Sequence, residues 1–119
     1  MNNSLICIFN LYKNLRSVQE IVGEILTMDY YVYNNDYEQS VLLIDQFVKK
    51  YNREIKLISS LRKDGIVVVD DDKTLYEEKD EVEVNSDAQY IRDCLIIIGA
   101  IRAGMRSDIR SVMEEIGWL

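Results

Sequence analysis

Apolar residues recur at three- and four-residue steps along much of the chain, which is the spacing of one face of an amphipathic helix. Ile21 and Ile25 are typical members of this face near the N-terminus. Ser17 and Glu20 have the spacing of a capping box, in which two side chains satisfy free backbone amides at the start of a helix. The pattern predicts one helix or two over residues 4–27.

The next segment, residues 28–36, has the sequence MDYYVYNND and ends in two asparagines and an aspartate. These residue types favour turns and helix caps. We therefore expect a turn in this segment and a new helix that begins near Tyr37.

The clearest helical pattern follows this turn. Apolar positions stay on one face through Tyr51 and Ile55 until Asp64 and Gly65 form a stop signal. One continuous helix over residues 37–63 accounts for these positions most simply. The alternative is a helix-turn-helix with its turn at Tyr51 and Asn52.

After this stop the pattern changes to the β-branched run IVVV at residues 66–69, followed by polar residues and then by the alternation Val82, Glu83, Val84. Runs of β-branched residues and strict alternation are both typical of strands. The sequence thus predicts a β-hairpin over about residues 66–84.

Helical spacing returns over residues 87–105, where the apolar run 94–101 makes the helix hydrophobic nearly all round, as expected of a buried central helix. A short last helix is expected over residues 107–116, with Gly117 as its stop. The order helix, helix, hairpin, helix, helix predicts one compact domain, residues 1–119, of the α+β class and mainly α.

Composition narrows the chemistry. The 119 residues include no His, which is the usual general base and the commonest metal ligand. Cys7 and Cys94 each stand in an apolar run, where we expect a buried and reduced thiol. No apolar run approaches the roughly 20 residues of a membrane span, and the N-terminal residues lack the basic start of a signal peptide. We expect a cytoplasmic protein with no membrane contact and no cofactor.

The net charge of −7 is distributed unevenly. Residues 49–63 carry six basic side chains and one acidic one, whereas residues 64–93 carry eleven acidic and three basic ones. Such polarisation is typical of proteins that bind charged partners, although a solvated surface with ordinary ion pairs is the alternative.

The basic segment and the run that follows it, residues 44–70, resemble the second half of a winged helix-turn-helix, a family of DNA-binding domains. The resemblance implies contacts from Arg53, Lys56 and Lys63 to duplex DNA. Two features oppose it: the apolar stripe shows no change of phase at the implied turn, and the implied wing carries many carboxylates that phosphates repel. Nucleic acid is therefore the less favoured partner.

Carboxylates crowd the predicted hairpin without the spacing of a calcium-binding loop, so we expect an exposed acidic turn and no metal site. These carboxylates are Asp70, Asp71, Asp72, Glu77 and Glu78.

Three tyrosines, Tyr30, Tyr31 and Tyr33, stand close together before the second predicted helix. Tyrosine rings are enriched at binding hot spots, and the alternative is that two of them cover the core.

The sequence has no nucleophile–base pair, no metal-ligand spacing and no phosphate-binding glycine loop, so we assign no catalytic residue and favour a binding protein over an enzyme. We expect a small acidic protein-binding module, comparable to inhibitors or immunity proteins, that occupies a basic surface of a protein partner with the hairpin carboxylates and the tyrosines. Two alternatives remain: a winged-helix transcriptional regulator, and a structural subunit or adaptor that forms a homo-oligomer.

Overall fold

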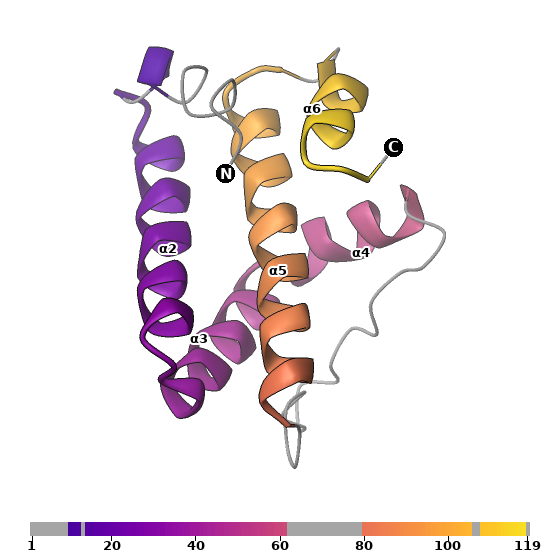
Figure 1. Cartoon of the computed structure of the whole chain (residues 1–119). Coiled ribbons are helices and arrows are strands. Elements are labelled where there is room, and N and C mark those ends of the chain that lie inside the picture. Colours follow the sequence, from indigo (N-terminus) through magenta and orange to yellow (C-terminus); the bar gives the residue numbers. More distant parts are fainter. Residues whose placement is uncertain (1–9, 13, 62–79, 106–107, 119) are drawn as a thin grey trace. The chain divides into compact units, whose positions relative to one another are not determined.

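A computed structural model of the chain describes residues 10–12, 14–61, 80–105 and 108–118 (Figure 1). Every regular element within these residues is a helix, and no strand occurs among them. The helices are α2 (Arg16–Tyr33), α3 (Tyr37–Lys50), α4 (Asn52–Leu61), α5 (Glu81–Arg102) and α6 (Ile109–Glu115). The fold is therefore all-α, and the predicted α+β class is wrong.

The predicted β-hairpin fails at its second strand, because Val82 and Val84 lie in the first turn of α5. Asp80 caps this helix: its carboxylate accepts a hydrogen bond from the backbone amide of Glu83 at 2.9 Å. Val84 is buried whereas Val82 is 76% exposed, so the two valines lie on different sides of a helix and do not share a strand face. The rest of the predicted hairpin, residues 66–79, lies outside the described residues.

Helix α2 extends to Tyr33, beyond the end that the sequence predicts near residue 27. It ends in a Schellman motif, in which Asn35 adopts the left-handed conformation with φ of 58°. The amide of Asp36 donates to the carbonyl of Tyr31 at 2.9 Å, and the amide of Asn35 donates to the carbonyl of Val32 at 3.1 Å. The turn predicted from Asn34, Asn35 and Asp36 is confirmed.

The start of α3 confirms one predicted helix boundary, and the start of α2 corrects another. Helix α3 begins at Tyr37, and the carboxylate of Asp36 accepts a hydrogen bond from the amide of Gln39 at 3.2 Å. This is the N-cap that the sequence predicts. Helix α2 begins at Arg16, so Ser17 lies inside its first turn and is not the cap.

Helices α3 and α4 are separate, so the single helix predicted over residues 37–63 is wrong (Figure 1). The break falls at Tyr51, with φ of −109° and ψ of 26°, where the alternative interpretation placed its turn. Backbone hydrogen bonds still run from the amide of Tyr51 to Phe47 at 2.9 Å and from the amide of Ile55 to Tyr51 at 2.8 Å. The side chains of Tyr51 and Ile55 are both buried, so the chain bends without interrupting its apolar stripe.

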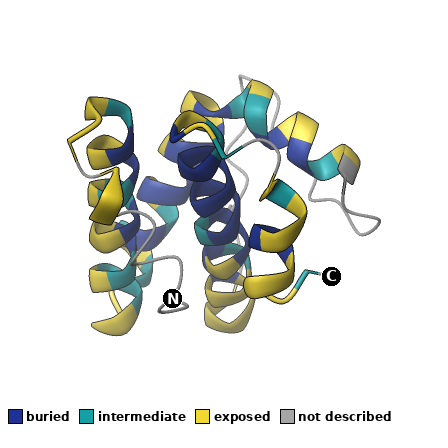
Figure 2. Cartoon of the chain, turned by 90° about the horizontal axis from the view of Figure 1, so that it is seen from above, coloured by how far each residue is buried: buried dark blue, intermediate teal, exposed yellow. Residues whose placement is uncertain are grey.

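The described residues form two compact units, one made of those up to Leu26 together with those from Leu95 onward, the other of Thr27–Cys94. Helices α2 and α5 contribute to both units. From Tyr90 to Ala100 every residue of α5 except Arg92 is buried, as the dark blue ribbon in Figure 2 shows. This confirms the prediction of a helix that is apolar nearly all round.

Helices α5 and α6 are each followed two residues later by a glycine with positive φ, 84° at Gly104 and 89° at Gly117. A residue with a Cβ atom would be strained in this left-handed conformation, so glycine is the residue that lets both helices stop. The predicted stop at Gly117 is confirmed. Helix α5 ends at Arg102, slightly earlier than predicted.

The burial of α5 is tested by Ile98→Ala, because Ile98 is only 1% exposed. We expect this change to lower the free energy of unfolding by about 2–5 kcal/mol, since burial is lost and a cavity is left. The control Val82→Ala, on the exposed side of the same helix, should change it by less than about 0.5 kcal/mol. Chemical denaturation measures both variants, and equal effects would contradict the assignment of the core.

Candidate functional site

Two of the three tyrosines singled out in the sequence are exposed on one side of α2. Tyr30 is 62% exposed and Tyr33 is 87% exposed, and residues three positions apart lie on the same face of a helix. Tyr31 is half-buried, and its ring meets that of Tyr30 edge-on, with 5.2 Å between centroids and 83° between the ring planes. The structure thus presents Tyr30 and Tyr33 outward, while Tyr31 supports Tyr30.

Carboxylates continue this surface through the turn into α3. Asp36 and Glu38 are both exposed and follow the tyrosines closely in the chain. No Lys or Arg occurs from residue 17 to residue 48, so every charged side chain in this stretch is negative. We call Tyr30, Tyr33, Asp36 and Glu38 the acidic–aromatic surface.

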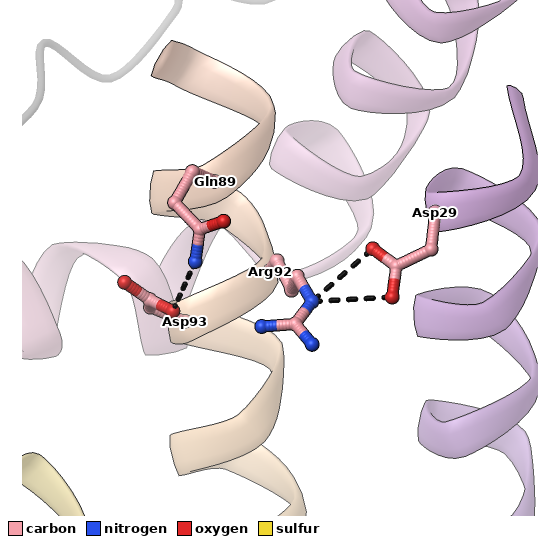
Figure 3. A network of polar contacts seen from close by, with 4 residues as sticks. All are labelled: Asp29, Gln89, Arg92 and Asp93. Atoms are coloured by element: carbon pink, nitrogen blue, oxygen red, sulfur yellow. Dashed lines mark hydrogen bonds and ion pairs between the residues drawn. The ribbon is translucent and has the colours of Figure 1, made fainter. Parts of the chain in front are cut away.

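An ion pair joins the tyrosine-bearing end of α2 to α5 (Figure 3). Nε of Arg92 donates to both carboxylate oxygens of Asp29, at 3.1 and 3.2 Å. The side chain of Arg92 is 14% exposed and that of Asp29 is 41% exposed, so the contact is partly shielded from water, where a charge-assisted hydrogen bond is stronger. Because Asp29 precedes Tyr30 directly, this contact helps to set which face of α2 turns outward.

Two further polar contacts on α5 each include one buried residue. Nε2 of Gln89 donates to the buried carboxylate of Asp93 at 3.0 Å, one helical turn away (Figure 3). The hydroxyl groups of Tyr90 and Ser59 lie 3.3 Å apart and share a hydrogen bond between α5 and α4. The second contact fixes the side of α4 that carries Ser59 against α5. The opposite side of α4 therefore faces solvent.

The basic residues that the DNA-binding alternative singled out lie partly on this outward side of α4. Arg53 and Lys56 are exposed, and Leu57 beside them is 69% exposed. Lys49, at the end of α3, is also exposed. We call Lys49, Arg53, Lys56 and Leu57 the α4 basic face. Lys63 lies outside the described residues.

The five carboxylates predicted as the main contact surface lie outside the described residues; they are Asp70, Asp71, Asp72, Glu77 and Glu78. In the part of the chain that the structure describes, no three His, Cys, Asp or Glu side chains come close enough together to hold a metal ion. Cys94 is free and buried, as predicted, whereas Cys7 falls in an undescribed segment.

No family model, no curated protein and no solved structure matches this chain. None of the described helices is sufficiently long and apolar to span a membrane. The functional hypotheses therefore depend on the two surfaces defined above.

The tyrosines were predicted from the sequence, but Asp36 and Glu38 were not predicted as members of the same surface, because the acidic contact was assigned to the hairpin. A usable signal was present, since residues 17–48 contain carboxylates and no cation. Leu57 was not predicted as a site residue either, because a single leucine in a helical pattern is usually a core residue.

A double-mutant cycle can measure the contact between Arg92 and Asp29. We expect a coupling energy of about 1 kcal/mol from Arg92→Ala, Asp29→Ala and the double variant, because the arginine is largely shielded from water. The control is Arg110 and Glu114 on α6, which lie 3.8 Å apart and are 84% and 57% exposed. Their coupling should not exceed about 0.3–0.5 kcal/mol. Equal coupling energies for the two pairs would show that the α2–α5 contact has no special role.

Proposed function

We propose that this protein is a non-catalytic protein-binding module whose acidic–aromatic surface occupies a basic surface of a protein partner. The observation that carries the proposal is the outward exposure of Tyr30 and Tyr33 beside two carboxylates. Large aromatic side chains that remain mostly in solvent gain little from folding, and contact with a partner would remove more of their surface from water.

Tyrosine and carboxylate side chains suit a partner rich in arginine and lysine. A tyrosine ring loses little conformational entropy on binding, and a cation placed over its face adds about 0.5–2 kcal/mol. The chain itself contains such a pair, since Nζ of Lys50 lies 5.3 Å from the centroid of the Tyr51 ring. The carboxylates of Asp36 and Glu38 supply the complementary charge.

The net charge of −7 supports the same class of partner, because an acidic protein attracts a basic one during diffusional encounter. Small inhibitors and immunity proteins act in this way, and a cytoplasmic location belongs to this proposal.

The winged-helix alternative loses support, because the second strand of its wing is the first turn of α5. Arg53 and Lys56 remain exposed, but duplex DNA would have to approach a chain of strongly negative net charge. A regulator of this type is therefore not proposed.

The proposal is tested with tagged full-length protein incubated in nuclease-treated lysate of the source cells, followed by quantitative mass spectrometry. Basic proteins captured by the wild type should be lost from the Tyr30→Ala/Tyr33→Ala variant. Hot-spot tyrosines contribute at least about 2 kcal/mol, so retention should fall about thirtyfold or more. Capture should also weaken as salt rises.

The matched control is Leu11→Ala/Val82→Ala, which removes two exposed apolar side chains elsewhere and should leave capture unchanged. Circular dichroism of each variant checks that the helices remain folded. A set of captured proteins that is the same for the wild type and the tyrosine variant would remove the acidic–aromatic surface from consideration.

A further inference from the structure

Helix α3 keeps opposite charges apart. Glu38 stands in its first turn, and Lys49 and Lys50 stand in its last turn. The helix has 14 residues, which at 1.5 Å per residue gives a length of about 21 Å. This length exceeds the Debye length of about 8 Å at physiological ionic strength, so the two charged ends of one chain do not neutralise each other.

The α4 basic face begins at the basic end of α3, and its cations form no ion pair within the part of the chain that the structure describes. Leu57 stands exposed next to these cations. A face that combines cations with a large exposed apolar side chain is suited to a surface that offers both carboxylates and apolar area.

We infer that the α4 basic face of one copy of this protein docks on the acidic–aromatic surface of a second copy. The cations of the basic face meet the two carboxylates or stack on the tyrosine rings, and Leu57 packs against those rings. Because the contact uses the acidic–aromatic surface, it rests on the proposed function and names the α4 basic face of a second copy as one basic surface to which it binds.

A second copy fits the basic face better than a nucleic acid does. A phosphate backbone would leave Leu57 without an apolar partner, and a polyanion is repelled by the net charge of −7. Two copies of the protein also repel each other at long range. At physiological salt this repulsion is screened beyond about 8 Å, whereas oppositely charged groups in contact still attract.

The contact is heterologous, since each copy uses one surface to bind and leaves the other free. Heterologous contacts produce rings or open chains, in contrast to the closed symmetric dimer formed by a self-complementary patch. Growth beyond two copies therefore distinguishes this contact from a symmetric dimer.

The first measurement is sedimentation velocity of the full chain over a range of protein concentrations. The wild type should form species larger than a monomer as concentration rises. These species should dissociate when salt is raised from about 0.1 M to about 1 M, because the Debye length falls from about 10 Å to about 3 Å.

The decisive measurement uses two variants, each lacking one surface. The acid-side variant is Tyr30→Ala/Tyr33→Ala/Glu38→Gln, and the base-side variant is Arg53→Glu/Lys56→Glu. Each alone should self-associate at least about tenfold more weakly than the wild type, because hot-spot or charge-pair contacts are removed. Their equimolar mixture should form a 1:1 dimer that grows no further, because it contains only one intact surface of each kind. Formation of this dimer also shows that both variants are folded.

The control Arg16→Glu/Arg110→Glu changes the charge by the same amount as the base-side variant, at exposed sites outside both surfaces. It should associate as the wild type does.

The inference would be overturned by a wild type that stays monomeric, by a variant that still associates alone, or by a mixture that stays monomeric. Duplex DNA shifted in a gel by the wild type but not by the base-side variant would identify nucleic acid as the occupant and would overturn it too. A monomeric wild type that still captures tyrosine-dependent basic proteins from lysate would refute self-association and leave the proposed function intact.

Discussion

Burial of α5 is the constraint on which the rest of the structure depends. Between Tyr90 and Ala100 the helix has almost no polar face, so it is stable in water only if it is covered on nearly every side. Each fully buried Leu or Ile side chain contributes about 1.5–3 kcal/mol, and Leu95, Ile96 and Ile97 are all of this kind. Helices α2, α3, α4 and α6 each bury one apolar stripe and leave the opposite side in solvent. The outward sides of these helices are therefore where binding surfaces can form.

The caps at the end of α2 and the start of α3 determine how the exposed sides of these two helices are connected. The left-handed Asn35 ends α2 and the Asp36 cap starts α3, so the exposed tyrosines and the first carboxylates of α3 are separated only by a tight turn. The contact between Arg92 and Asp29 ties the same end of α2 to α5. The acidic–aromatic surface thus depends on two helix caps and one partly buried ion pair, none of which belongs to the apolar core.

Much of the helical structure could be predicted from apolar spacing, but one class of error has a clear cause. Val82, Glu83 and Val84 alternate as in a strand, yet three residues are too few to distinguish a period of 2 from a period of 3.6. The neighbouring residues carried the missing information, because Asp80 and Glu83 have the spacing of a helix cap and its third residue, and acidic residues favour the first turn of a helix. The second strand of the predicted hairpin came from this alternation, taken without its cap.

The break at Tyr51 was predicted only as an alternative, through the resemblance to a helix-turn-helix. It contains no Gly or Pro, and the buried stripe passes through it, so apolar spacing alone favours one continuous helix. For the candidate site, the residue types indicated the tyrosines, but burial had to be known before Tyr31 could be separated from Tyr30 and Tyr33. Exposure of Leu57 likewise depends on the direction that α4 takes after the break.

Some of the charged side chains stabilise the helix that carries them, whereas others do not and are better explained by binding to a partner. Glu38 at the start of α3 and Lys49 at its end each interact favourably with the helix dipole, by about 0.3–1 kcal/mol. Arg53 has no such reason, because it lies in the first turn of α4, where the dipole opposes a cation. Tyr33 and Leu57 likewise remove little apolar area from water in the folded chain. These side chains contribute little to the stability of the fold, or oppose it locally, and they stand on surfaces of opposite charge. Contact with another surface explains them better than folding does.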